Sequence, residues 1–355
     1  DAITNLLIVL RQDFHNASIV TPLRCLPVPV PPQTLQHWLG LARAARASDL
    51  HLSAGQPPRV RAEGQMRALS GHPLSPDEAD ALRCQALQGA GIAHPSTDTD
   101  FALNLPPHLH GAGLVLRLLP GQVPDLAQLE VPPAVMPWLD APGGLVLVTG
   151  ATGSGKSTTL AALVQHLNVT RQGHILTLED PIEFVHTSVQ CQIHQREIGR
   201  HTPDFATGLR AALREDPDVI LVGELRDLDS IRLALTAAET GHLVLATLHT
   251  RSATHTISRL VDVFPPADKH SVRNQLSLSL LGVVSQQLLP SLQGPRMAVH
   301  EVLSCTPAIR HLIREDKLSH IDNALQTGAA HGMQTMQQAL QRGVSAGRLA
   351  ASMVA

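Results

Sequence analysis

Four short runs of consecutive apolar residues stand out in the second half of the chain, at residues 145–149, 175–178, 219–222 and 243–247. A central strand of a parallel sheet is buried on both faces, so its sequence is continuously apolar rather than alternating. Segments with the periodicity of helices separate the four runs. The pattern therefore predicts α/β architecture, a doubly wound sheet with helices on both faces.

The first half of the chain carries shorter and more mixed patterns. Apolar residues recur at helical spacing over residues 35–46, and apolar and polar residues alternate over 49–52 and 59–62. Ser75, Pro76 and Glu78 form a capping box with proline at the first helical position, which predicts a helix over 76–87. Further strands are expected at 100–105 and 113–119. These elements predict a small α/β domain over residues 35–120.

Proline and glycine mark the boundaries between the domains. Five prolines between residues 22 and 32 block regular structure, so residues 1–34 are interpreted as an N-terminal extension with a proline-rich linker. A second stretch rich in proline and glycine predicts a linker over 121–143, before a larger domain at 144–355. Residues 275–289 are expected to form a packed helix, because polar side chains interrupt their apolar character. Helices are also expected beyond Pro307.

Composition excludes several classes of protein. The 355 residues include two Trp, no Tyr and five Phe, and the net charge is −3. Such a chain offers neither aromatic platforms for bases nor the basic field that a nucleic-acid backbone demands, so no nucleic-acid partner is expected. The four cysteines contain no C-x-x-C pair, which argues against a zinc module.

Residues 150–157 fit the phosphate-binding pattern G-x-x-x-x-G-K-[ST] between an apolar strand and a helical run. Glycines allow successive backbone N–H groups to surround a phosphate at a helix N-terminus. Lys156 would reach the β- and γ-phosphates of ATP, and the Ser157 hydroxyl would bind Mg²⁺. A turn without function is the alternative. The candidate nucleotide-binding residues are Gly150, Thr152, Gly153, Ser154, Gly155, Lys156, Ser157 and Thr158.

Acidic and histidine residues follow the other predicted strands. Glu224 comes just after the run at 219–222, at the strand end where open α/β sheets bind ligands, and is expected to activate water and support the metal indirectly. Its alternative role is to cap the next helix. Glu179, Asp180 and Glu183 follow the run at 175–178, where a solvated acidic turn is the alternative. His249, and more weakly His242, flank the run at 243–247 as candidate γ-phosphate sensors.

Four ordered segments, at residues 150–160, 176–183, 212–224 and 240–250, resemble the Walker A, Asp box, Walker B and His box of the secretion-superfamily ATPases. Residues 48–53, 306–317 and 332–336 resemble the type IV pilus retraction (twitching motility) branch. The lack of a four-cysteine zinc module agrees with that branch. The resemblance extends over residues 35–349.

The resemblance implies a PAS-like N-terminal domain and a RecA-like P-loop ATPase domain. It implies a homo-hexamer with ATP at the subunit interfaces, located in the cytoplasm and peripheral to the inner membrane at the pilus base. An inner-membrane pilus platform protein would be its partner, with a paralogous retraction ATPase as a further one. The helix at 308–317 would serve motor output rather than hydrolysis. The implied site residues are Lys156 and Ser157, Glu224, the Asp-box residues Glu179, Asp180 and Glu183, the His-box residues His242 and His249, and Arg226 facing a neighbouring subunit.

One departure from the family pattern leaves alternatives open. Retraction motors carry a further strand with an Arg-x-Arg arrangement, which is missing here after residue 105. Only Arg117 remains where such an arginine is expected, and a surface arginine on an edge strand is the alternative. The chain could thus be an accessory or weakened paralogue. A pilus-extension or type II secretion ATPase is another alternative, and a DNA translocase or a pure binding module is less favoured.

Overall fold

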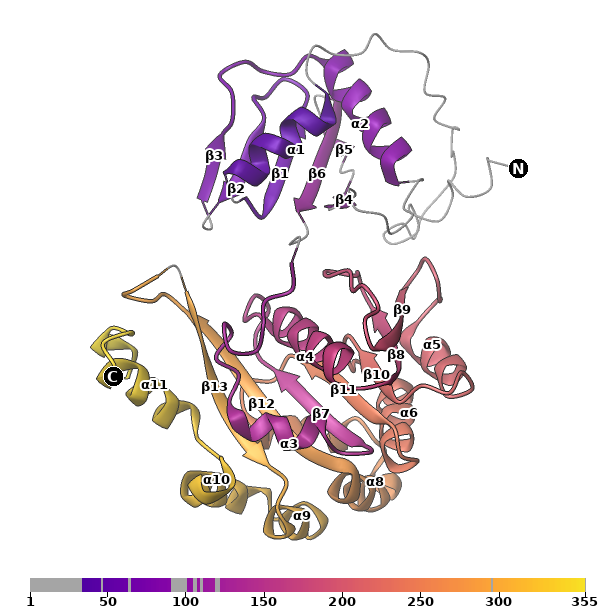
Figure 1. Cartoon of the computed structure of the whole chain (residues 1–355), viewed down its shortest axis with the longest axis vertical. Coiled ribbons are helices and arrows are strands. Elements are labelled where there is room, and N and C mark those ends of the chain that lie inside the picture. The colour runs from indigo at the N-terminus through magenta and orange to yellow at the C-terminus, as the bar shows by residue number, and fades with distance from the viewer. Residues whose placement is uncertain are drawn as a thin grey trace. The chain divides into compact units, whose positions relative to one another are not determined.

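The computed structural model describes residues 34–45, 47–62, 65–90, 101–104, 107–108, 111–118, 122–294 and 296–354. The N-terminal extension predicted over residues 1–34 therefore lies outside the described residues, except for Thr34. Two compact units divide the chain, and the larger one extends over Val123–Ala355. Figure 1 shows both units, and each is described here by itself.

The smaller unit is a six-stranded antiparallel sheet with two helices packed on it (Figure 1). The strand order is β3-β2-β1-β6-β4, and β5 pairs with β6. Its centre is apolar, with Leu39, Leu50, Leu82 and Leu116 fully buried. The elements are α1 Leu35–Ala44, β1 Asp49–Ser53, β2 Arg59–Ala62, β3 Gln65–Ala68, α2 Pro76–Ala90, β4 Phe101–Asn104, β5 Pro107–His108 and β6 Gly111–Leu118.

The predicted capping box is confirmed at the start of α2. The backbone N–H of Glu78 donates to the Ser75 hydroxyl over 3.2 Å, and the backbone N–H of Ser75 donates to the Glu78 carboxylate over 2.8 Å. Both bonds satisfy amides that the helix itself leaves unpaired. The helix therefore begins where the sequence predicts.

The larger unit is built on a seven-stranded sheet of order β13-β12-β7-β11-β10-β8-β9. All neighbouring strands are parallel except β12 and β13. The α/β fold class is thus confirmed. The strands are β7 Gly144–Thr149, β8 Gly173–Glu179, β9 Cys191–Glu197, β10 Val219–Val222, β11 Leu243–Leu248, β12 Leu280–Leu289 and β13 Met297–Ser304.

Helices cover both faces of this sheet and bury two separate apolar clusters (Figure 1). One cluster packs α3 and α4 against the sheet, and the other packs α5 to α10. Among the described residues, no helix has the combined length and apolar character needed to cross a bilayer. The helices are α3 Met136–Leu139, α4 Lys156–Thr170, α5 Phe205–Ala212, α6 Leu228–Glu239, α7 Ala253–Asp262, α8 Pro266–Ser279, α9 Pro307–Arg314, α10 Ile321–Thr327 and α11 Met336–Ser345.

The single helix expected over residues 275–289 is wrong. Helix α8 ends at Ser279, and β12 continues from Leu280 as a strand parallel to β7. Four of the polar residues that were taken to interrupt an apolar helix, Ser277, Ser279, Ser285 and Gln286, are buried and hydrogen-bonded instead, as the Ser285 hydroxyl is with that of Thr149 at 2.9 Å. Buried polar groups with partners are compatible with a central strand.

The linker expected over 121–143 is largely a packed part of the larger unit. Val135 and Leu139 are fully buried, and Trp138 is 7% exposed in the same cluster as α4. The indole of Trp138 lies over Gly282 of β12, where an added Cβ would come within 2.3 Å of the ring. Only a residue without a side chain allows this approach.

We therefore expect Gly282→Ala to lower the free energy of unfolding of the larger unit by about 1–3 kcal/mol, the usual cost of overpacking a core. Thermal unfolding followed by tryptophan fluorescence would measure the change. The control is Gly294→Ala, because a Cβ on Gly294 would meet no atom within 4 Å. Equal melting temperatures for the two variants would contradict the close approach of Trp138.

Candidate nucleotide-binding site

The loop between β7 and α4 has the backbone that its glycines permit. Gly150, Gly153 and Gly155 have φ of 149°, 78° and 89°, a region that residues with side chains rarely adopt. At Gly150 an added Cβ would also lie 2.4 Å from the carbonyl oxygen of Gln286. All three positions therefore favour glycine on grounds of conformation, and Gly150 also on grounds of space. It turns the N-terminus of α4 toward the carboxyl ends of the parallel strands.

Lys156 opens α4 and is 8% exposed. Its ammonium donates to the carbonyl oxygens of Gly150 at 2.9 Å and Ala151 at 3.1 Å, so it lies within the loop. Burial lowers the pKa of Lys156, while the negative charges of Glu224 and Glu183 act in the opposite direction. Glu224 and Glu183 thus lie close enough to Lys156 for their charges to act on it.

The loop is held from the side by β12, a contribution that the sequence did not reveal. The side-chain amide of Gln286, which is 3% exposed, donates to the carbonyl oxygen of Ser154 at 2.7 Å. Its oxygen accepts from the Thr159 hydroxyl at 2.8 Å. One buried side chain thus joins the loop to the first turns of α4.

Replacing Gln286 with leucine, which has a similar size, would remove both bonds and leave the Thr159 hydroxyl and the Ser154 carbonyl without this partner. Each such loss costs about 1–3 kcal/mol. We expect ATP affinity to fall by roughly tenfold, measured by equilibrium binding of a fluorescent ATP analogue. Gln287→Leu is the matched control, since Gln287 is the exposed neighbour on the same strand. Unchanged affinity in the Gln286 variant would mean that the loop holds its shape without β12.

A charged network connects the ends of four parallel strands. One carboxylate oxygen of Glu224 accepts from Arg226 Nη2 at 2.8 Å and lies 3.3 Å from His249 Nε2. His249 Nδ1 lies 3.4 Å from the hydroxyl of Thr152 in the loop. Arg226 Nη1 also lies 3.7 Å from a carboxylate oxygen of Asp180. The network thus brings together residues from all four sequence segments that were expected to form the site.

The ionisation of Glu224 follows from these contacts. Burial by itself raises the pKa of Glu224, but the hydrogen bonds and charges of Arg226 and His249 outweigh it, and the net pKa is lowered. The carboxylate is therefore ionised at neutral pH and can accept a hydrogen bond from water. Arg226 was expected to face a neighbouring subunit, and in this chain it pairs with Glu224 and Asp180.

Glu179 is turned toward β9. One oxygen of its carboxylate accepts from the Thr177 hydroxyl at 2.6 Å and from the Gln195 side-chain amide at 3.0 Å. Burial raises the pKa of Glu179, although both hydrogen bonds oppose that change. Through these contacts Glu179 joins the carboxyl end of β8 to β9, next to the site. Gln195 is a second residue that the sequence did not single out.

Two residues that were expected in the site, His242 and Arg117, lie outside the network around Glu224. His242 precedes β11, at the opposite end of that strand from His249, and its Nδ1 lies 3.0 Å from the carbonyl oxygen of Ala237. Six residues of extended strand separate the two histidines, so this chain does not bring His242 to the network. Arg117 belongs to the smaller unit, where its Nε donates to Asp49 at 3.1 Å.

Arg117 does not lie on an edge strand, which was the alternative expected for it. Arg117 has an exposed side chain on β6, but β6 pairs with both β1 and β4 and is not an edge strand. Between β4 and β6, the described residues include the two-residue strand β5, which contains no arginine.

Comparison with known proteins indicates the same family as the sequence motifs do. Residues 91–295 match the family described as "Type II/IV secretion system protein". The chain is 50% identical to the type IV pilus retraction ATPase PilT of Pseudomonas aeruginosa, over 85% of this chain and 91% of that protein. It is 49% identical to the uncharacterized protein YggR of Escherichia coli, over 89% of this chain and 99% of that protein.

A solved structure agrees as well. The crystal structure of the pilus retraction motor PilT with bound ADP superposes with a TM-score of 0.82 at 39% identity, covering 91% of this chain and 96% of that one. The phosphate-binding loop, the carboxylate network at the strand ends and these relatives all indicate an ATPase. The chain therefore belongs to the type II/IV secretion system protein family, among the ATPases related to pilus retraction motors.

Proposed function

We propose that this chain is a Mg-ATP-hydrolysing hexameric motor that drives type IV pilus retraction and thereby twitching motility. The observation that carries the proposal is the network from Thr152 through His249, Glu224 and Arg226 to Asp180, close to Lys156. In such a site the loop and Lys156 hold the phosphates. Glu224 orients and deprotonates the attacking water, and His249 links Glu224 to the loop.

Mg²⁺ fits the residues present. The Ser157 hydroxyl is exposed in the first turn of α4, next to Lys156. No group of three or more His, Cys, Asp or Glu side chains in the described residues is arranged to hold a metal. Mg²⁺ keeps several waters and binds substrate phosphates, so it needs few protein ligands, and the Ser157 hydroxyl would be one of them. Glu224 would act on the ion only indirectly. The bound ion would neutralise charge on the phosphates.

The remaining partners follow from the resemblance. Six copies would form a ring, peripheral to the inner membrane on its cytoplasmic side, and would act on the pilus platform protein. A deletion strain tests this function: excess surface pili without twitching are expected. Loss of pili would instead identify an extension motor and overturn the retraction assignment.

A weakened, accessory paralogue is the second candidate. The observation in its favour is that Arg117, the one arginine expected at the position of the missing strand, pairs with Asp49. Steady-state ATPase activity of the purified protein separates the two functions, because a motor turns over ATP whereas an accessory subunit binds it without turnover.

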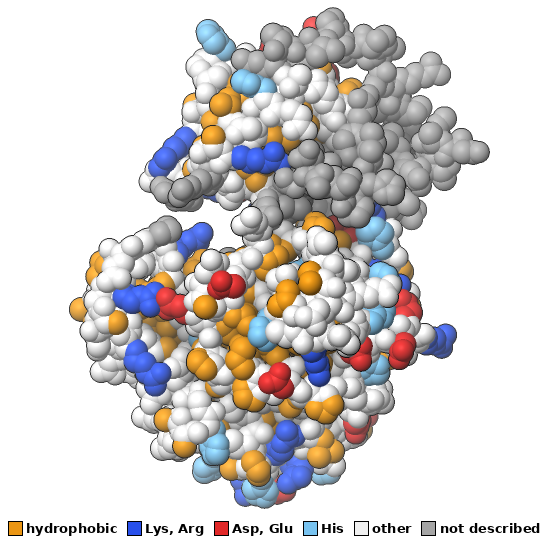
Figure 2. Space-filling model, in the orientation of Figure 1, with side chains coloured by type: hydrophobic (Ala, Val, Ile, Leu, Met, Phe, Trp, Pro, Cys, Tyr) orange, Lys and Arg blue, Asp and Glu red, His pale blue; other side chains and the backbone are white. Residues whose placement is uncertain are grey.

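A DNA translocase has less support. On the face shown in Figure 2, the Lys and Arg side chains of the larger unit are scattered, some of them beside Asp or Glu, and form no single patch. A nucleic-acid backbone needs a continuous basic surface. Hydrolysis that is stimulated by DNA would revive this alternative.

A further inference from the structure

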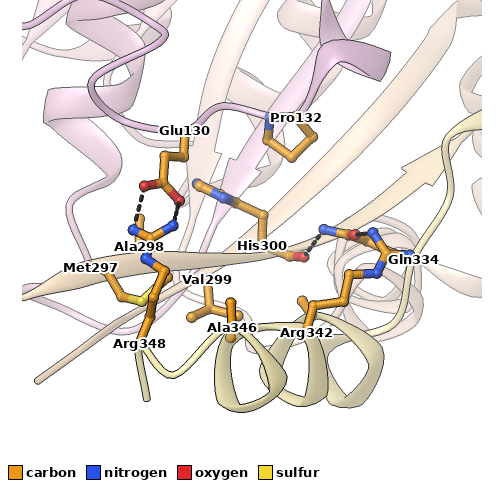
Figure 3. Close-up of a pocket in the computed structure, with 12 residues that line it drawn as sticks. Glu130, Pro132, Met297, Ala298, Val299, His300, Gln334, Arg342, Ala346 and Arg348 are labelled. Carbon is orange, nitrogen blue, oxygen red and sulfur yellow. Dashed lines mark hydrogen bonds and ion pairs between the residues drawn. The ribbon is translucent and has the colours of Figure 1, made fainter. Parts of the chain in front are cut away.

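The segment at residues 332–336, which resembles the retraction branch but takes no part in the nucleotide site, is bonded to the edge strand β13. The backbone N–H of Val302 donates to the carbonyl oxygen of Gln334 at 2.9 Å, and the N–H of Gln334 donates back at 3.1 Å. The side-chain amide of Gln334 donates to the carbonyl oxygen of His300 at 2.7 Å, and its oxygen accepts from Arg342 of α11 (Figure 3). The segment is therefore fixed on β13 just before α11 begins.

Glu301, on the same stretch of β13, joins the N-termini of two helices through its carboxylate. One oxygen accepts from the backbone N–H of Met336, the first residue of α11, at 3.2 Å. The other accepts from the backbone N–H of Ala253, the first residue of α7, at 2.8 Å. A helix leaves these first amides without internal partners. Burial raises the pKa of Glu301, which is 9% exposed, and both bonds oppose that change. The two amides thus replace the water that the carboxylate loses on folding.

Helix α7 begins shortly after His249, so the position of its first turn bears on that histidine. The hydroxyl of Thr256 lies 2.6 Å from that of Thr250 and donates to the carbonyl oxygen of Ser252 at 2.7 Å, which ties the intervening turn to the helix. The side chain of His249 is 43% exposed, so neighbouring atoms hold it only in part. Its ring lies 3.3 Å from Glu224 and 3.4 Å from the Thr152 hydroxyl. Both separations exceed that of a typical hydrogen bond, about 2.9 Å, so a small shift of the turn would break them.

We propose that Glu301 is a positioning residue for ATP hydrolysis: it fixes the start of α7 against the segment at 332–336 and thereby holds His249 beside Glu224. Glu301 itself does not contact the nucleotide-binding network, and its carboxylate acts through the backbone of α7. Displacement of a catalytic group by about 1 Å can reduce a rate by roughly 10²-fold. The proposal rests on the proposed ATPase function, whereas the connection between the two helices does not.

The first test separates turnover from binding in two variants. Glu301→Gln keeps the size and one acceptor oxygen, but the amide nitrogen accepts no bond, so the connection between the two helices is broken whichever N–H loses its partner. Glu301→Leu removes both acceptors. We expect kcat to fall about tenfold in Glu301→Gln and further in Glu301→Leu, while the affinity for a fluorescent ATP analogue stays within about twofold of the native value. Glu239→Gln removes an exposed, hydrogen-bonded carboxylate of α6 and should leave both quantities unchanged. An affinity that falls as much as kcat would place the effect in the phosphate-binding loop and overturn the proposal.

A double-mutant cycle shows whether Glu301 acts through His249. Single-turnover hydrolysis with the full chain in excess over ATP is measured for Glu301→Gln, His249→Ala and the double variant, so that low residual rates are detected. Residues that act as one unit have non-additive effects. In the His249→Ala background we therefore expect Glu301→Gln to lower the rate by less than about twofold. The same tenfold loss in both backgrounds would mean that Glu301 acts independently of His249.

Hydrogen exchange of backbone amides measures the connection without relying on hydrolysis. In Glu301→Leu we expect faster exchange at the starts of α7 and α11 and native exchange in β7 and α4. Native exchange at both helix starts would refute the connection, and faster exchange throughout the larger unit would reduce Glu301 to a general role in stability. If the native chain did not hydrolyse ATP, the proposed function would fail, and exchange would still decide whether Glu301 fixes the start of α7.

Discussion

Replacing Glu224 with glutamine is expected to reduce ATP hydrolysis by roughly 10²–10⁴-fold, while ATP affinity stays within a few-fold of the native value. Glutamine has the size of glutamate and can still accept hydrogen bonds from Arg226 and His249, the two groups that contact Glu224. It cannot take a proton from water. The chemical step should therefore be lost, whereas the loop and Lys156 continue to bind the phosphates. Steady-state phosphate release and equilibrium binding of a fluorescent ATP analogue measure the two quantities.

Glu239→Gln provides the matched control, because Glu239 lies at the end of α6 and accepts a hydrogen bond from Gln275 outside the site. That variant should hydrolyse ATP at the native rate. If Glu224→Gln retained most of the activity, another group would have to be the base, and Asp180 would be the first to examine because it lies on the other side of Arg226. If the variant also lost ATP binding, Glu224 would have a structural role in the loop.

The sequence predicted the centre of the larger sheet because those strands are buried on both faces and therefore continuously apolar. It missed β9, whose residues from Gln192 to Glu197 are half-buried or exposed at the sheet edge and so give no apolar run. It also missed β12, since no glycine or proline marks the change from helix to strand at Ser279 and Leu280. Tertiary contacts decide that boundary: β12 pairs with β7 between Leu280 and Ser285 and with β13 from Gly282 to Leu289.

Within the site, the sequence predicted the residues that lie on the carboxyl ends of strands. The network around Glu224 joins such positions, and each can be found from its own local motif. Gln286 could not be found in this way, because its contact with Ser154 connects residues 132 positions apart in the sequence. His242 shows the opposite failure. It lies in a segment that matches a motif, but it precedes the apolar run and therefore lies at the amino end of β11, away from the carboxyl ends where the network forms.

Lys156→Ala is expected to weaken ATP binding by roughly 10–100-fold and to remove measurable hydrolysis. Hydrogen bonds to a charged group contribute about 1.5–3 kcal/mol, and each 1.4 kcal/mol is a factor of ten in affinity. The ammonium lies inside the loop, 2.9 Å from the carbonyl oxygen of Gly150, so a phosphate in the loop would meet it directly. Isothermal titration calorimetry with ATP and Mg²⁺ measures the loss.

Two further variants make this result specific to the loop. Lys156→Arg keeps the charge, but the site is 8% exposed and the guanidinium is larger and planar, so we expect no recovery of hydrolysis. Lys269→Ala removes a lysine whose partner is Asp262, far along the chain from the loop, and should bind ATP as the native chain does. Native affinity in Lys156→Ala would mean that backbone amides alone bind the phosphates, and recovery in Lys156→Arg would mean that charge matters more than shape. We expect hydrolysis to be lost in both variants at position 156, and ATP binding to be unchanged in Lys269→Ala. That result would identify a compact ammonium, fixed by the turn at Gly150, as the group that the phosphates require.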